Sequence, residues 1–287
     1  VEKKLISNYD NTVKYLFSFA DNCCVESVVM KYKHGYSICI STQVGCRMGC
    51  TFCATGKSGF SRNLTASEML AQIQSAQKDL GIQISNIVLM GMGEPLDNYQ
   101  QVLRFLELVS SDEGMNIGMR HISVSTCGIV DKIYDMANRK LQCTLSVSLH
   151  APNDNLRSQT MPINKKWGVA QLLKACKYYS DTTRRRISFE YAMISGLNDS
   201  DAQARELAGK LKGILSHVNL IPVNDVTGNH YKKSSAQRLH AFCSILEKHG
   251  ITATVRRTLG SDIQASCGQL QRRYKEEVNN IESAQSN

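Results

Sequence analysis

The sequence predicts an α/β protein built on a parallel β-sheet. Apolar, β-branched runs alternate with amphipathic helical stretches about six times, a pattern typical of parallel β/α architecture. At 287 residues the chain is shorter than a typical eightfold barrel, which favours a partial barrel or an open sheet. In such folds ligands bind at the carboxyl ends of the strands, so polar residues that follow the strands are the first candidates for a site.

The individual elements follow from local pattern. Two alternating runs, residues 12–19 and 25–32, predict a β-hairpin extension that leads into the first parallel strand. The expected parallel strands are residues 37–42, 86–90, 121–125, 144–150, 186–194, 217–224 and 252–257. The expected helices are residues 66–80, 99–110, 130–139, 169–179, 200–211 and 235–249. Thr65 and Ser200 suit helix N-termini, and Gly250 suits a helix C-terminus.

Composition and charge exclude several classes of protein. A chain that is 42% hydrophobic and 21% charged is neither disordered nor low in complexity. No window approaches the roughly 18 uninterrupted apolar residues of a membrane span, and no signal-peptide pattern opens the chain, so we expect a cytoplasmic protein with no membrane partner. A formal net charge of +9 favours a polyanionic partner, RNA or DNA first.

The cysteines carry the strongest chemical signal. Eleven cysteines without a secretion signal argue against a disulfide framework. Cys46, Cys50 and Cys53 form a C-x3-C-x2-C motif directly after the strand at 37–42, and Gly45 and Gly49 permit a tight loop. A structural zinc site normally has four ligands in paired C-x2-C knuckles, and no second knuckle is present. Three thiolates suit a [4Fe–4S] cluster with one iron open to a ligand, whereas buried free thiols are the alternative without chemistry.

This motif resembles the signature of radical S-adenosylmethionine (SAM) enzymes. The resemblance implies a partial (β/α)6 barrel, and a cluster whose open iron binds the amino and carboxylate groups of SAM. Gly93 and Glu94, in the Gly-Met-Gly-Glu-Pro segment after the strand at 86–90, then correspond to the loop that holds the amino group of SAM. Further polar groups at successive strand ends are candidates for the remaining SAM contacts: Ser125, Ser148, Leu149, His150 and Asn224.

A more specific resemblance, to the RlmN family of dual-specificity RNA methyltransferases, runs from about residue 11 to residue 270. It rests on the segments 62–65, 150–154, 161–166, 219–222 and 255–270. The resemblance implies methylation of adenine C2 in 23S rRNA, at the peptidyl transferase centre, and in the tRNA anticodon loop. It identifies Cys267 as the residue that carries the methyl-derived carbon as S-methylcysteine, Cys39 as the cysteine that resolves the protein–RNA intermediate, and Glu26 as the base.

The same resemblance implies partners and a domain organisation. Two SAM molecules are used per turnover, and an external one-electron donor and a disulfide reductant are required; we expect a monomer. Residues 1–36 are expected to form the β extension, 37–271 the partial barrel with a C-terminal catalytic loop, and 272–287 a charged tail. The family's N-terminal helical accessory domain is expected to be absent.

Two alternatives remain open from the sequence. One is a Cfr-type enzyme, which methylates adenine C8 and confers antibiotic resistance. The other is a non-catalytic iron–sulfur or zinc module that binds RNA.

Tyr32 and Tyr231, each beside lysines, could stack on unpaired bases. The basic groups that could face RNA are Lys31/Lys33, Lys165/Lys166, residues 184–186, Lys232/Lys233, Arg256/Arg257 and Arg272/Arg273.

Overall fold

The structure is a computed structural model that describes residues 1–223, 231–263, 265 and 270. Its strands are β1 (Lys3–Ile6), β2 (Val13–Ser18), β3 (Cys24–Tyr32), β4 (Gly35–Cys39), β5 (Gln43–Gly45), β6 (Phe60–Asn63), β7 (Ile84–Leu89), β8 (Ile122–Thr126), β9 (Thr144–Ser148), β10 (Ile187–Met193), β11 (Ser216–Pro222) and β12 (Ala253–Val255). Its α-helices are α1 (Ala54–Lys57), α2 (Ala66–Leu80), α3 (Tyr99–Ser110), α4 (Val130–Asn138), α5 (Asp154–Thr160), α6 (Val169–Thr183), α7 (Asp201–Leu211) and α8 (Ala236–Lys248). Short 3₁₀ turns cover Met119–His121 and Pro162–Lys165.

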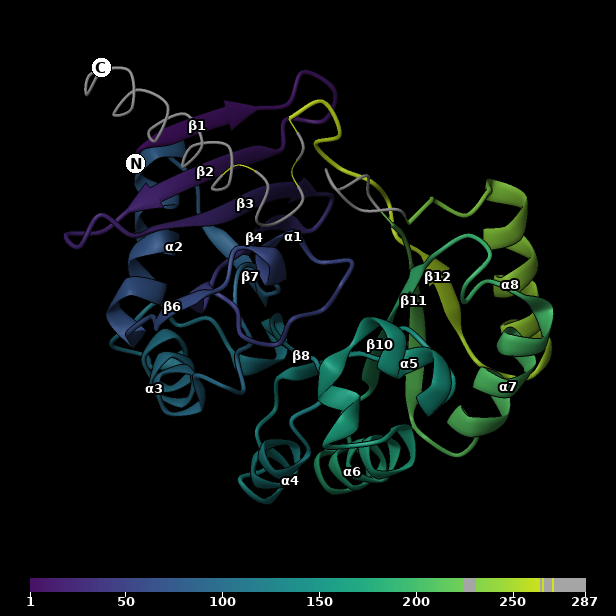
Figure 1. Cartoon of the computed structure of the whole chain (residues 1–287). Helices are drawn as coiled ribbons and strands as arrows, with labels where there is room; N and C mark the ends of the chain where they lie inside the picture. Colours follow the sequence, from purple (N-terminus) through teal and green to yellow (C-terminus); the bar gives the residue numbers. More distant parts are fainter. Residues whose placement is uncertain (224–230, 264, 266–269, 271–287) are drawn as a thin grey trace, which may run out of the picture.

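Ten of these strands form one curved sheet in the order β1-β2-β3-β4-β7-β8-β9-β10-β11-β12. From β4 onward, neighbouring strands are parallel, whereas β1, β2, β3 and β4 pair antiparallel. The parallel strands curve into an arc with α2, α3, α4, α6, α7 and α8 on its outer side (Figure 1). The predicted α/β partial barrel with an N-terminal β extension is confirmed.

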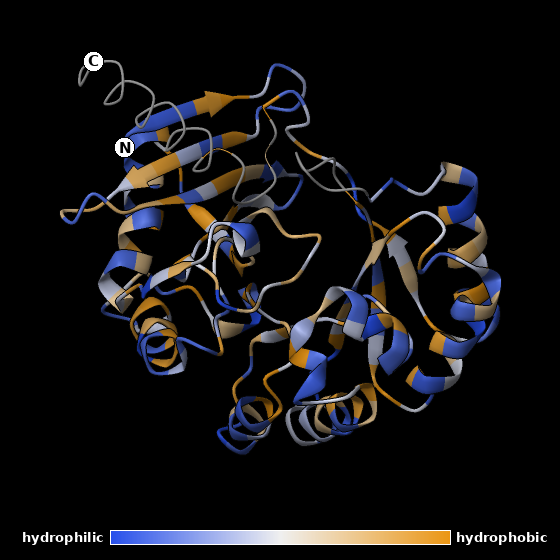
Figure 2. Cartoon of the chain, viewed as in Figure 1, coloured by the Kyte–Doolittle hydropathy of each residue, from blue (hydrophilic) through white to orange (hydrophobic). Residues whose placement is uncertain are grey.

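The hydrophobic core lies between the sheet and these outer helices. Apolar strand residues such as Ile87, Leu145 and Phe189 are fully buried, as are Ile73 and Phe105 on the helices. Figure 2 shows hydrophobic residues along the strands and hydrophilic ones concentrated on the surrounding helices. In the part of the chain that the structure describes, no helix combines the length and the apolar character needed to span a bilayer.

Two differences from the sequence prediction have local causes. The extension contains a third strand, β1, which is only four residues long and half exposed, too short for an alternating pattern to stand out. The strand predicted at 37–42 ends at Cys39. The next residues leave the sheet ladder to bind the loop after β7, since Gly91 N donates to Ile40 O at 3.0 Å and Thr42 N donates to Met92 O at 2.8 Å.

Candidate active site

The three motif cysteines lie on the loop between β5 and α1. This loop is pinned at its start, because Cys46 N donates to Gly59 O at 2.8 Å. Gly45 adopts a positive φ of 78°, and a Cβ there would lie 1.9 Å from Gly59 O. Only glycine fits at this position, which explains why a glycine precedes the first cysteine. Thr51 N donates to Thr160 O at 2.9 Å and holds the middle of the loop against the end of α5.

The three thiols lie close enough to influence one another. Burial, with smaller contributions from the neighbouring Glu94 and Cys53, raises the pKa of Cys46 to about 12. Burial also raises the pKa of Cys50, and Cys53 and Cys46 act in the same direction. Three thiolates in this environment therefore need a cationic group between them, which an iron–sulfur cluster provides.

These three donors suit a cluster in number and kind. Within the described ranges, no three His, Cys, Asp or Glu side chains are arranged to hold one metal ion. Three thiolates leave one iron of a [4Fe–4S] cluster open to a further ligand. The donor set of Cys46, Cys50 and Cys53 fits the cluster in its chemistry.

Glu94 lies beside this loop and is 4% exposed. Burial raises the pKa of Glu94, while backbone hydrogen bonds oppose that shift. Its two carboxyl oxygens accept from Leu96 N at 3.0 Å and from Cys127 N at 2.7 Å. Gly93 has a φ of 103°, and a Cβ there would lie 2.6 Å from Gln43 Cβ. Glu94 therefore joins the ends of β7 and β8 next to the cysteine loop, and its predicted contact with SAM stays a prediction.

The ends of β8 and β9 bring further predicted residues to the same rim. Ser125 pairs with Ser146 in the β8–β9 ladder. Ser148 ends β9, and Leu149 is fully buried, so Leu149 offers only backbone groups. His150 is buried at a φ of 57°, and its ring packs edge-on against Phe52, within the cysteine loop, at a centroid distance of 4.8 Å.

The imidazole of His150 is a neutral hydrogen-bond acceptor in this fold. Burial and the nearby Arg157 guanidinium lower the pKa of His150 to about 3. Its Nδ1 accepts from Ala192 N at 2.9 Å, which ties the end of β9 to β10. Asn224 and Cys267 lie outside the described residues, so their roles stay predictions from the sequence.

The sequence prediction did not include Arg157, although this side chain is completely buried. It donates to Leu149 O and Ser148 O at 3.1 Å each, and also to Cys127 O. The guanidinium thus ties together the ends of β8 and β9 and places a positive charge near the Cys50 thiol. A single arginine in a polar helix has no sequence signal that separates it from a surface charge.

The predicted base and resolving cysteine come together on β3 and β4. Cys39 is opposite Val28 in the ladder, and Glu26 precedes Val28 by two residues, on the same face of β3. Glu26 is 1% exposed and forms an ion pair of 2.9 Å with Lys14, which is also fully buried. Lys14 is a second residue that the sequence prediction missed; the available signal was a lysine within the apolar run of β2.

Ser41 links this pair of residues to the SAM-side loop. Its hydroxyl donates to Glu26 O at 2.6 Å and accepts from Met92 N at 2.9 Å. Since Met92 directly precedes Gly93, the backbone of β3 is bonded through one buried hydroxyl to the loop that carries Glu94. One buried hydroxyl therefore connects the strand of Glu26 with the loop of Gly93 and Glu94.

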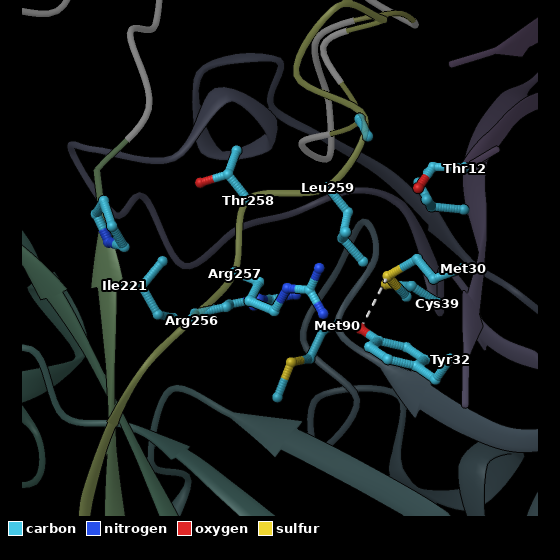
Figure 3. A pocket seen from close by; sticks show the side chains of 13 residues that line it. Thr12, Met30, Tyr32, Cys39, Met90, Ile221, Arg256, Arg257, Thr258 and Leu259 are labelled. Atoms are coloured by element: carbon cyan, nitrogen blue, oxygen red, sulfur yellow. Dashed lines mark hydrogen bonds between the residues drawn. The ribbon is translucent and has the colours of Figure 1, made fainter. Parts of the chain in front are cut away.

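A cavity of about 240 Å³ opens beside Cys39 (Figure 3). Its walls come from β3, β4 and the segment after β12, and include Val28, Met30, Met90, Arg256 and Leu259. Thr12 also lines it, and its buried hydroxyl has no hydrogen-bond partner among the described atoms. A cavity of this kind, mostly apolar with a few polar groups, suits a small organic ligand such as a nucleobase.

The segment after β12, residues 256–263, is held over this cavity by the turn between β1 and β2. Asp262 accepts from Ser7 Oγ at 2.7 Å and from Asn8 N at 2.8 Å. Asp10 accepts from Gly260 N at 2.8 Å. These bonds fix the described residues that precede Cys267 to the β extension, as a wall of the cavity that Cys39 also lines.

Comparison with known proteins agrees with this geometry. The sequence profile of the radical SAM superfamily matches residues 40–208. Two curated relatives carry the name probable dual-specificity RNA methyltransferase RlmN. The one from Clostridium novyi is 54% identical, over 96% of this chain and 80% of its own length. The one from Clostridium tetani is 56% identical, over 96% of this chain and 78% of its own length.

A solved structure shows the same similarity in three dimensions. The crystal structure of a radical SAM methyltransferase from Sphaerobacter thermophilus has a TM-score of 0.90 and 46% identity, covering 93% of this chain and 79% of that chain. The family profile covers more than half of the sequence, and the named relatives match over most of their length. The chain therefore belongs to the RlmN family of the radical SAM superfamily.

Proposed function

We propose that this chain methylates C2 of adenine in RNA, with 23S rRNA and tRNA as substrates, and that it acts in the cytoplasm as a monomer. Adenine C2 carries an inert C–H bond, so a polar methyl transfer to this carbon is not available and a radical route is needed. Cys46, Cys50 and Cys53 would hold the [4Fe–4S] cluster, and the rim residues would hold SAM: Gly93, Glu94, Ser125, Ser148, Leu149, His150 and Asn224. When bound, the cluster and SAM supply the one-electron chemistry that removes a hydrogen atom from the methyl group being transferred.

The chain's own side chains account for the remaining steps. Cys267 carries the methyl-derived carbon on its sulfur and becomes joined to the adenine through it. Glu26 takes the proton that leaves C2. Cys39 then attacks the Cys267 sulfur and breaks its bond to the methyl-derived carbon, which takes up a proton and leaves as the methyl group of the product. The Cys39–Cys267 disulfide that remains must be opened by an external reductant. A separate one-electron donor is also required.

The observation that carries this proposal is the placement of Cys39. It faces a cavity whose opposite wall, Arg256 to Leu259, is the described segment that leads toward Cys267. The segment is fastened by hydrogen bonds to the β extension that also contains Glu26. A resolving cysteine needs such proximity, because both sulfurs must approach to disulfide distance.

Two cysteine variants with unequal outcomes test the assignment. Cys39→Ala keeps the carrier but lacks the attacking thiol, so it should accumulate a covalent protein–RNA species, seen as a shifted gel band that RNase trims. Cys267→Ala should form neither that species nor product. Cys176→Ala, which alters a buried thiol of α6, is the matched control and should turn over normally. Normal turnover by Cys39→Ala, or methylation by Cys267→Ala, would contradict the roles proposed for these two cysteines.

The position of methylation is tested on the product. Mass spectrometry of nucleosides from treated RNA separates 2-methyladenosine from 8-methyladenosine by retention and fragmentation. We expect the C2 product. The C8 product would reassign the chain to Cfr-type chemistry and leave the cysteine roles intact.

A further inference from the structure

A second cavity, of about 410 Å³, lies directly beside the one that contains Cys39. It is formed by the turn between β3 and β4 on one side and by the segment after β12 on the other. Tyr32, Arg257 and Leu259, which Figure 3 labels on the first cavity, also line the second, so these three residues form the boundary between the two. A ligand that occupies the first cavity and continues past this boundary enters the second.

The second cavity is predominantly basic. Lys31, Lys33 and His34 project from one turn, and Arg257 lies across from them. Some surface lysines of the chain form ion pairs, such as Lys177 with Asp181. Among the residues that the structure describes, Lys31, Lys33 and Arg257 form no ion pair. These three cations are therefore available to an anion from outside the chain.

One carboxylate, that of Asp10, also lines this cavity, but its oxygens are already engaged. Asp10 accepts from Thr12 N at 3.0 Å and from Gly260 N at 2.8 Å. The pKa of Asp10 is lowered: partial burial opposes ionisation, but the hydrogen bonds from Thr12 and Gly260 outweigh it. Asp10 thus fastens the wall of the cavity as an ionised carboxylate, and the single negative charge leaves the lining net positive beside Lys31, Lys33 and Arg257.

The cavity also presents an aromatic surface. The rings of Tyr32 and His34 stack at a centroid distance of 5.4 Å with an interplanar angle of 10°. The Tyr32 hydroxyl donates to Met30 Sδ at 3.6 Å, which fixes the ring at the boundary between the cavities. Unpaired RNA bases are bound by stacking on such rings, with nearby cations on the backbone.

We propose that this second cavity binds the nucleotide next to the target adenine. Lys31, Lys33 and Arg257 hold its phosphate, and the Tyr32–His34 pair stacks on its base. The inference rests on the proposed function, because it takes the adenine to lie in the Cys39 cavity. The ligand of the two cavities is then a single-stranded RNA that continues by at least one nucleotide past the target adenine.

Fluorescence anisotropy with a labelled RNA hairpin, whose loop contains the target adenine, tests the phosphate contacts. The double variant Lys33→Ala/Arg257→Ala should bind at least about tenfold more weakly at low salt. Its slope of log affinity against log salt should be smaller in magnitude by about 0.7, since both residues hold the same phosphate and one lost phosphate contact removes about 0.7 for single strands. The control Lys177→Ala/Lys210→Ala removes the same charge from the outer helices α6 and α7 and should leave the slope unchanged. Equal weakening by both double variants would overturn the proposal, because it would show only diffuse attraction.

The stacking contact is tested separately. Tyr32→Phe keeps the ring and should bind within about twofold of wild type, whereas Tyr32→Ala should lose about 5- to 100-fold, as expected for one stacked base. Equal affinities for the two variants would overturn the stacking assignment.

Product formation separates this proposal from the proposed function. In the Lys33→Ala/Arg257→Ala variant, KM for RNA should rise while kcat stays within about twofold of wild type, because the reacting groups are untouched. A wild-type enzyme that forms no methyladenosine would refute the proposed function itself. A variant with unchanged KM, next to an active wild type, would refute only the second cavity's role.

Discussion

Removal of the Lys14 cation should destabilise the protein strongly. Lys14 and Glu26 are separated by 2.9 Å and are 0% and 1% exposed. At an effective dielectric constant of about 20, their attraction is about 6 kcal/mol, and the desolvation of both charges offsets much of it. Lys14→Met leaves a buried carboxylate without this partner, so the free energy of unfolding should fall by about 3–5 kcal/mol. Urea unfolding followed by circular dichroism measures the change.

A double-variant cycle isolates the pair. Lys14→Met/Glu26→Leu removes both charges and should be much more stable than Lys14→Met alone, because no uncompensated charge remains in the strands. Lys4→Met is the control: Lys4 forms an ion pair with Asp79, but both side chains are about a third exposed, and the cost should stay below about 1 kcal/mol. A loss below about 1 kcal/mol for Lys14→Met, or additive effects in the cycle, would refute the reasoning.

Three further predictions address the loops and the rim. Gly45→Ala should lose most of its iron after anaerobic reconstitution, whereas Gly59→Ala, with a similar φ of 72° but open space, should retain it; equal iron content would disprove the steric explanation. Because the pKa of His150 is lowered to about 3 from 6.5, the unfolded state binds more protons between these pH values, so stability should fall as pH falls from about 6.5. His150→Gln should reduce that slope by up to about 1.4 kcal/mol per pH unit in urea titrations, and an unchanged slope would show that His150 titrates normally. Asp262→Ala should lower kcat by roughly five- to tenfold with unchanged iron content, since it releases the described segment after β12 from Ser7 and Asn8. The exposed Asp181→Ala should have no effect, and equal rates would mean that this segment needs no such fastening.

Periodicity was sufficient to predict most of the parallel sheet. The apolar pattern of each strand and helix indicates which side of that element is buried. Burial of these apolar sides between the sheet and the helices is what stabilises a parallel β/α fold. Helix starts were also readable: Thr65 and Ser200 both form capping boxes, because the side-chain chemistry of a cap acts within four residues. Strand β1 was missed because four half-exposed residues carry no such pattern.

Sequence patterns alone predicted only those candidate site residues that lie close to one another in the sequence. The cysteines of the loop are close in sequence, so their spacing alone indicated a cluster. Glu26 and Cys39 needed the family resemblance, since a strand glutamate and a buried cysteine are ordinary residues when taken singly. Lys14 and Arg157 were not predicted because their partners, Glu26 and the strand-end carbonyls, are brought to them only by the tertiary fold.

The bonds from the β1–β2 turn to the segment after β12 join residues very distant in the sequence. Ser7 and Asp262 are 255 positions apart, and Asp10 and Gly260 are 250 apart. Contacts of such separation form late, because the loop between them must first be ordered. During synthesis, Glu26 and Cys39 leave the ribosome roughly 10 to 50 s before Asp262 at typical elongation rates. A nascent chain therefore presents Cys39 before the wall of the cavity after β12 has been made. On the role proposed for Cys267, no copy of the enzyme modifies RNA until its own translation has passed that residue.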